Sequence, residues 1–149
     1  MPVGIKKIVI PVDFSPASEQ AARYGCALAR SLDARVYLIH VLEPSLAVSM
    51  DSVHREAADA RAALLAMAQQ IAPEARPITE VRIGSIAASI TKAVVAYGGD
   101  LVVMGTHGRT GFSHLVHGSI AEEVIRTVPS PVLVVRENGV RMHQAQVAA

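Results

Sequence analysis

Short runs of apolar residues alternate along the chain with longer segments in which apolar residues recur every three or four positions. The runs are rich in β-branched residues and nearly continuous, a pattern typical of strands that are covered on both faces. We therefore expect five strands, over residues 7–12, 35–42, 78–83, 100–104 and 131–135.

The segments between these runs predict helices. Ser15 followed by Pro16 is a capping residue with proline in the first turn, and it predicts a helix that continues to about Leu32. Gly98-Gly99 indicates the end of another helix, because glycine readily adopts the left-handed conformation of a C-terminal cap. The helix that these glycines end is expected over residues 86–97, and the other two helices over residues 53–71 and 119–128.

Strict alternation of strand and helix requires crossover connections, which make neighbouring strands parallel and place helices on the sheet faces. The sequence thus predicts an α/β fold of the Rossmann-like type, an open doubly wound parallel sheet with helices on both faces. We expect a single domain over residues 1–136 and a polar C-terminal tail over residues 137–149.

Charge and cysteine content narrow the possible partners. The formal net charge is +1, so no long-range field would attract nucleic acid or an anionic membrane, and we expect neither as a partner. Cys26 is the single cysteine and cannot form an internal disulfide, which suits a reducing cytoplasm. Its place among helix-forming residues predicts a buried, unreactive thiol.

A glycine-punctuated segment from Gly105 to Ser119 follows the fourth strand and carries the clearest functional signal. Gly105 and Gly108 can turn backbone N–H groups towards an anion, and the expected helix start at Gly118-Ser119 favours negative charge. Ser119 also begins a capping box with Glu122, which would satisfy the helix end without any ligand. The segment by itself predicts an anion site, with phosphate the natural occupant.

The usual phosphate-binding motifs are absent. The chain has no G-x-x-x-x-G-K-[ST] and no G-x-G-x-x-G at its first helix. Without a Walker lysine, only Arg109 and the nearby histidines could bring positive charge to a triphosphate, so we expect a divalent ion, Mg²⁺ or Mn²⁺. Fast phosphoryl transfer is therefore not supported.

The spacing Gly105-x-x-Gly108, nine residues, then Gly118-Ser119 resembles the G-2x-G-9x-G-(S/T) motif of the ATP-binding universal stress proteins. Pro11-Val12-Asp13-Phe14-Ser15, His40-Val41 and the segment 129–135 are also similar to that family. The resemblance spans residues 5–136 and implies the strand order 3-2-1-4-5.

In such a sheet the first and fourth strands are neighbours, and ligands bind beyond their carboxyl ends. The resemblance implies that ATP binds there in a regulatory protein of stress adaptation, which hydrolyses ATP slowly or not at all. It also implies a homodimer through the last strand, at Val132, Leu133, Val134 and Val135. The implied nucleotide-binding residues are Pro11, Val12, Asp13, Ser15, Val41, Met104, Gly105, Thr106, His107, Gly108, Arg109, Gly118, Ser119 and Ile120.

Other readings of the same residues remain open or are disfavoured. His107, His114 and His117 lack the cysteine or acidic partners of a zinc site. Ser89-x-x-Lys92 matches the motif of acyl-serine enzymes without its companion motifs, and we expect it on the solvent face of the third helix. Two alternative functions are an ATP-using enzyme of the related adenine-nucleotide α/β group and a nucleotide-independent, partner-binding dimer. We propose no catalytic residue.

Overall fold

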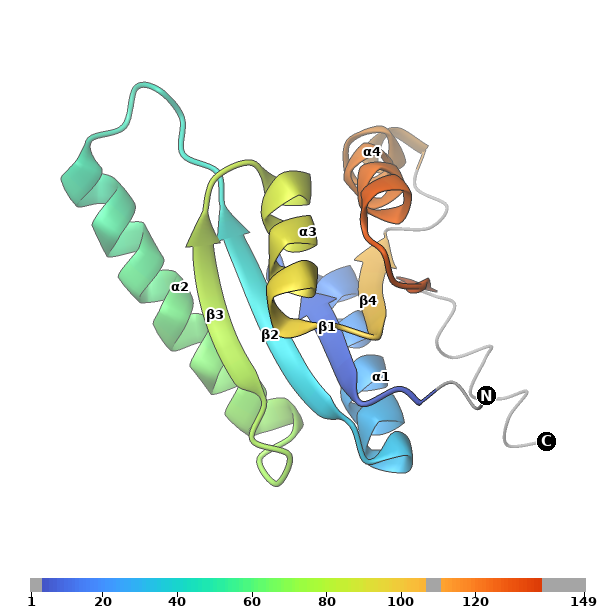
Figure 1. Cartoon of the computed structure of the whole chain (residues 1–149). Helices are drawn as coiled ribbons and strands as arrows, with labels where there is room; N and C mark the ends of the chain where they lie inside the picture. Colours follow the sequence, from blue (N-terminus) through green and yellow to red (C-terminus); the bar gives the residue numbers. More distant parts are fainter. Residues whose placement is uncertain (1–3, 107–110, 138–149) are drawn as a thin grey trace.

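The computed structural model describes residues 4–106 and 111–137, with side chains in the second range described from Ser119 onward. Strands and helices alternate along the chain, as the hydrophobic pattern predicts (Figure 1). The elements are β1 (Lys7–Pro11), α1 (Pro16–Leu32), β2 (Arg35–Leu42), α2 (Met50–Ile71), β3 (Ile78–Ile83), α3 (Ile86–Tyr97), β4 (Leu101–Thr106), α4 (Gly111–Thr127) and β5 (Val132–Arg136).

The five strands form one parallel sheet in the order β3-β2-β1-β4-β5, which confirms the predicted topology. The chain passes from β1 towards β2 and β3 on one side, and β4 and β5 lie on the other side. The connections that leave β1 and β4 therefore diverge at their carboxyl ends. This divergence leaves space at the carboxyl ends of β1 and β4, where the ligand site is expected.

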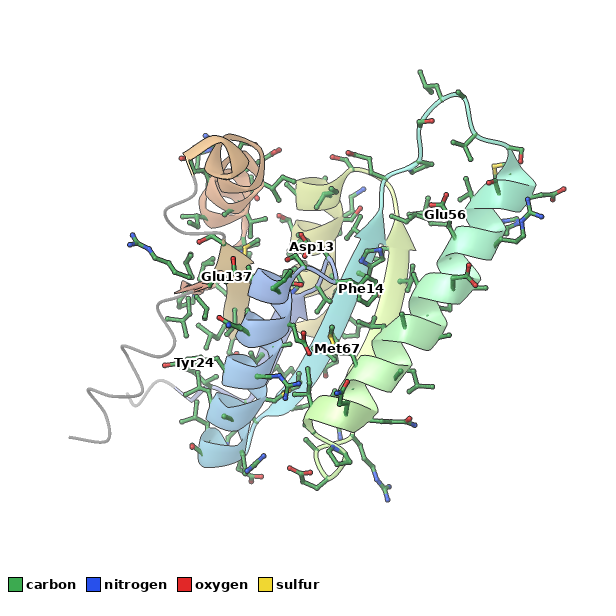
Figure 2. All side chains as sticks on the ribbon, turned by 180° about the vertical axis from the view of Figure 1, so that it is seen from behind. Asp13, Phe14, Tyr24, Glu56, Met67 and Glu137 are labelled. Atoms are coloured by element: carbon green, nitrogen blue, oxygen red, sulfur yellow. The ribbon has the colours of Figure 1, made fainter. Side chains whose placement is uncertain are left out.

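Helices cover both faces of the sheet, and each face has its own apolar core (Figures 1 and 2). The helices α1 and α2 pack on one face, where Ile10 and Leu38 from the sheet contact residues such as Leu64. The helices α3 and α4 pack on the other face, around Val9 and Val102. Aliphatic side chains fill both layers, in keeping with the low aromatic content.

Two predicted helix ends are confirmed. Ser15 is the N-cap of α1, with its Oγ accepting a hydrogen bond from the backbone N–H of Ser18 at 3.2 Å, and Pro16 opens the first turn. Gly98 ends α3 in the left-handed conformation with φ of 68°. α1 and α3 lie on opposite faces of the sheet, so these caps fix one helix end on each face.

The predicted start of the last helix is wrong. We expected a loop up to Ser119, but α4 begins at Gly111, so Ser119 lies inside the helix and the capping box does not form its N-terminus. The sequence contains a reason for the earlier start: Phe112, Val116, Ile120 and Val124 recur at steps of four, an apolar helical stripe that continues through Gly118. One glycine inside a helix costs about 1 kcal/mol relative to alanine, which such a stripe can offset.

The expectation for Ser89 is also wrong, whereas the expected burial of Cys26 is confirmed. Ser89 is only 8% exposed, because it belongs to the sheet-facing side of α3 together with Ile90. Cys26 is 3% exposed, and burial raises the pKa of its thiol to about 11. No helix within the described ranges is long and apolar enough to cross a membrane.

Candidate functional site

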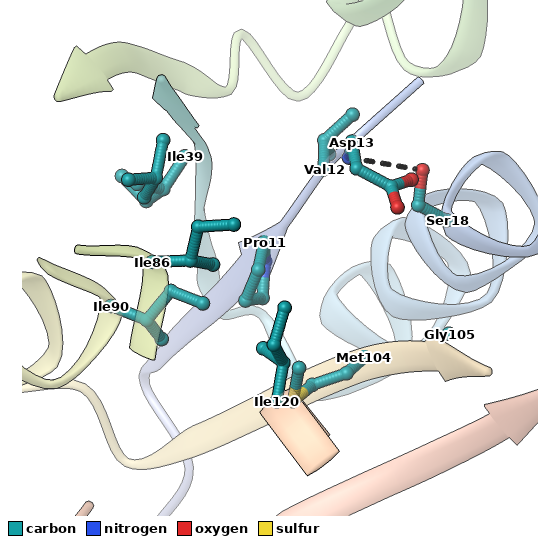
Figure 3. Close-up of a pocket in the computed structure, with 11 residues that line it drawn as sticks. Pro11, Val12, Asp13, Ser18, Ile39, Ile86, Ile90, Met104, Gly105 and Ile120 are labelled. Atoms are coloured by element: carbon teal, nitrogen blue, oxygen red, sulfur yellow. Dashed lines mark hydrogen bonds between the residues drawn. The ribbon is translucent and has the colours of Figure 1, made fainter. Parts of the chain in front are cut away.

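A cavity of about 230 Å³ opens at the carboxyl ends of β1 and β4, where the strand order reverses (Figure 3). Four elements besides these two strands contribute to its wall, since β2, α1, α3 and α4 all reach this edge. The lining residues are Pro11, Val12, Asp13, Ser18, Ile39, Val41, Ile86, Ile90, Met104, Gly105 and Ile120. Its position is the one at which open α/β sheets bind ligands.

The turn between β1 and α1 forms the polar side of the cavity. The Asp13 N–H donates to Ser18 Oγ at 3.2 Å (Figure 3). Ser18 Oγ donates in turn to the carbonyl of Ser15 at 3.1 Å. The Ser15 N–H donates to Asp13 Oδ1 at 2.9 Å. In Figure 3 the Asp13 carboxylate lies beside Ser18, across the cavity from Ile86 and Ile90.

Gly105 in β4 sits against the backbone of the first turn of α1. A β-carbon at this position would lie 2.3 Å from the carbonyl oxygen of Ala17 and 2.9 Å from the backbone nitrogen of Ser18. The absence of a side chain is therefore what lets β4 and α1 approach each other and close this side of the cavity. Glycine at position 105 has a structural role that the motif spacing alone does not reveal.

The inner wall of the cavity is aliphatic. Ile39 and Val41 come from β2 and face the same side of the sheet, because side chains two residues apart in a strand share a face. Ile86 and Ile90 come from α3, and Ile120 comes from α4. Such a surface suits a flat apolar ring, whose burial is favoured by roughly 25 cal/mol per Å² of apolar area.

Charged groups are sparse in this cavity. Asp13 is the one ionisable side chain among the described residues that line it. Within the ranges the structure describes, no three His, Cys, Asp or Glu side chains gather at one point as metal ligands. The described wall can bind and orient a ring and offer a carboxylate, and it holds no pair of groups for acid–base chemistry.

The structure brings half of the predicted site residues to this cavity: Pro11, Val12, Asp13, Val41, Met104, Gly105 and Ile120. Three others lie nearby without lining it. Ser15 caps α1, the Thr106 carbonyl accepts the Glu137 N–H at 3.1 Å, and Ser119 lies within α4. His107, Gly108 and Arg109 lie outside the described residues, and so do the surroundings of Gly118.

Four lining residues were not predicted from the sequence: Ser18, Ile39, Ile86 and Ile90. Ile39 could have been found from strand periodicity, since it precedes the predicted Val41 by two positions. Ile86 and Ile90 share a helix face that the sequence pattern shows, but nothing in the pattern distinguishes a cavity wall from a filled core. Ser18 carries no local signal beyond its position three residues after the N-cap.

Comparison with known proteins agrees with this architecture. The model of the Universal stress protein family matches residues 4–136. The universal stress protein MJ0531 of Methanocaldococcus jannaschii is 34% identical over 142 residues, covering 89% of this chain and 82% of that protein.

Two solved structures share the fold. A universal stress protein in complex with cAMP has 19% identity and a TM-score of 0.73, with 91% of this chain and 99% of that chain covered. The Archaeoglobus fulgidus universal stress protein in complex with dAMP has 18% identity and a TM-score of 0.62, covering 91% and 100%. The match of the family model over nearly the whole described chain, together with the MJ0531 relative, shows that the chain belongs to the universal stress protein family.

Proposed function

We propose that this protein binds an adenine nucleotide, ATP with Mg²⁺ or Mn²⁺, in the cavity between β1 and β4. The observation that carries the proposal is the aliphatic cavity at the point where the strand order reverses, with Asp13 at its polar side. The base would be buried against Val41, Ile90 and neighbouring side chains, and the ribose would lie towards Asp13. Two proteins of the same fold were solved with cAMP and dAMP, both adenine nucleotides, which supports this choice of ligand.

The phosphates are proposed to lie beyond the end of β4. The helix α4 begins at Gly111, and the unpaired N–H groups of a helix N-terminus favour an anion. The proposed phosphate partners remain His107, Gly108 and Arg109, which follow β4 in the sequence, with Gly118 and Ser119 of the motif. The described cavity wall offers no metal-ligand cluster, so we propose that the ion is held chiefly by phosphate oxygens.

The cavity favours binding over catalysis. Asp13 is the one ionisable group in the described lining, and the Ser18 hydroxyl beside it bonds to the Asp13 N–H and the Ser15 carbonyl, not to an acid–base group. Phosphoryl transfer requires groups that neutralise and position the transferring phosphoryl. We therefore propose a protein that holds ATP and hydrolyses it slowly or not at all.

We further propose that the protein acts in the cytoplasm as a homodimer paired through β5. β5 is an edge strand of the sheet, and Val134 within it is 37% exposed. An apolar edge strand invites pairing with another chain, and a second copy supplies an identical partner. Nucleotide occupancy at the carboxyl edge could then regulate contacts of the dimer during stress adaptation.

Mass spectrometry of the small molecules released on denaturing the purified protein tests this proposal. We expect an adenine nucleotide in a ratio approaching one per chain when purification is rapid. Release of a different class of ligand, such as a guanine nucleotide or a flavin, would contradict it.

A further inference from the structure

His40 contacts the end of β1 from the face of the sheet opposite to the cavity. Its side chain shares a face with Leu38, which packs under α1 and α2, while Ile39 and Val41 face the cavity. His40 Nδ1 lies 2.7 Å from the carbonyl oxygen of Val12. Since a carbonyl can only accept, Nδ1 must carry the proton of this hydrogen bond.

This bond lies where the backbone ladder between β1 and β2 stops. The strands pair from Lys7 with Arg35 to Pro11 with Ile39, and one more bond joins the Val12 N–H to the Ile39 carbonyl at 2.8 Å. In a continuing parallel ladder, the next bond would join the Val41 N–H to the Val12 carbonyl. The imidazole of His40 holds that carbonyl instead.

The Val41 amide consequently faces the ligand cavity. Backbone groups two residues apart in a strand point to the same side, so the Val41 peptide points as Ile39 does, towards β1. β1 has already ended at Pro11, and the space beyond it is the cavity that Val41 lines. A donor in this position suits a ring nitrogen of a bound base.

The ring of Phe14 also contacts the imidazole of His40. The rings of Phe14 and His40 lie 4.7 Å apart between centroids at an interplanar angle of 41°. Phe14 lies beside Asp13 in Figure 2 and has φ of 64°, a left-handed conformation that bulky side chains rarely adopt. The tilted ring contact and the hydrogen bond together retain this unfavourable turn, next to the carboxylate of Asp13.

We propose that His40 is a positioning residue: its hydrogen bond draws the Val12 carbonyl out of the β1–β2 ladder towards the opposite face of the sheet, and this leaves the Val41 N–H available to a ring nitrogen of the ligand. The ligand in this inference rests on the proposed nucleotide binding. The role of His40 in ending the ladder concerns the free protein and does not depend on that ligand. His40 itself is not among the residues that line the cavity.

Two substitutions separate the effect of the hydrogen-bond donor of His40 from that of its aromatic ring. His40→Phe keeps an aromatic ring beside Phe14 and removes the donor, so the Val41 N–H can bond to the Val12 carbonyl. We expect Val41 amide exchange to slow about tenfold and ATP binding with Mg²⁺ to weaken about tenfold, the effect of one hydrogen bond. His40→Asn places an amide donor near the position of Nδ1, and we expect both quantities to stay within about threefold of the wild type.

Amide hydrogen exchange of the unsubstituted protein provides an independent test. We expect the Val41 amide to exchange faster than that of Ile39, because Ile39 still pairs with Pro11 within the ladder. Equal protection of the two amides would overturn the inference, and so would a folded His40→Phe protein with unchanged Val41 exchange. General destabilisation would speed exchange and not slow it. If the wild type binds no ATP, the proposed function fails while the exchange data still decide the role of His40.

Discussion

Gly105 at the end of β4 lies so close to α1 that a β-carbon there would approach the Ala17 carbonyl oxygen to 2.3 Å. This contact joins the two elements whose ends form one wall of the nucleotide cavity. Because the neighbour is backbone and not a flexible side chain, α1 or β4 would have to move to accept any larger residue.

Gly105→Ala should therefore lower the free energy of unfolding by about 2 kcal/mol, the typical cost of overpacking a tight contact. Urea denaturation followed by circular dichroism measures this loss. Gly4→Ala is the matched control, because a β-carbon at Gly4 meets nothing within 4 Å, and it should change stability by less than about 0.5 kcal/mol. Equal effects of the two substitutions would contradict the assigned role of Gly105.

Ile120→Phe should obstruct nucleotide binding with little effect on folding. Ile120 is half-buried and lines the cavity from α4, so a larger side chain would occupy space that the base needs. We expect ATP affinity to fall by about tenfold or more, as measured by calorimetry, the consequence of losing about 1.4 kcal/mol of binding free energy. Ile125→Phe, at a 50% exposed position of the same helix, should bind ATP as the wild type does.

Cys26 should remain unreactive in the folded protein and should make stability depend on alkaline pH. Burial raises the pKa of its thiol from 9.0 to about 11, so the folded state retains the proton where the unfolded state loses it. The stabilisation is complete below pH 9 and decreases as the pH rises to about 11.

Denaturation of the wild type and of Cys26→Ala across this range isolates the effect from other titrating groups. The stability difference between the two proteins should shift against the wild type as the pH rises. A thiol reagent should label Cys26 at pH 8 only after unfolding. Rapid labelling of the native protein would show that the thiol is accessible.

Val134→Asp should convert the proposed dimer to a monomer. Two copies paired through β5 would bring two introduced carboxylates together across the twofold axis, where like charges repel. Analytical ultracentrifugation well above micromolar concentration measures the outcome. Val95→Asp, on the exposed side of α3, should leave the association state unchanged. A wild-type monomer under the same conditions would remove the dimer proposal.

The sequence predicted the sheet well because buried parallel strands have continuous apolar runs and the Ser15 and Gly98 caps are local signals. It failed at the start of α4, where a local capping pattern at Ser119 competed with a helical stripe that continues further back towards Gly111. A local pattern shows which residues favour a helix end. It does not show which of several candidate ends tertiary packing selects.

The cavity was predicted in part for a similar reason. Asp13 and Gly105 are recognisable because polar residues and glycines at strand ends are exceptions to an apolar pattern. Ile39 and Ile90 are not exceptions, and an isoleucine that lines a cavity has the same sequence context as one that fills a core. The ladder-ending bond of His40 also depends on register, which the sequence leaves unspecified.

Isothermal calorimetry of the purified, nucleotide-free protein with ATP and Mg²⁺ is the most direct test of nucleotide binding in the cavity. We expect saturable binding of one nucleotide per chain, with Ile120→Phe weakened and Ile125→Phe unchanged in parallel titrations. The absence of heat and of saturation at millimolar ATP, with the protein still folded, would contradict it.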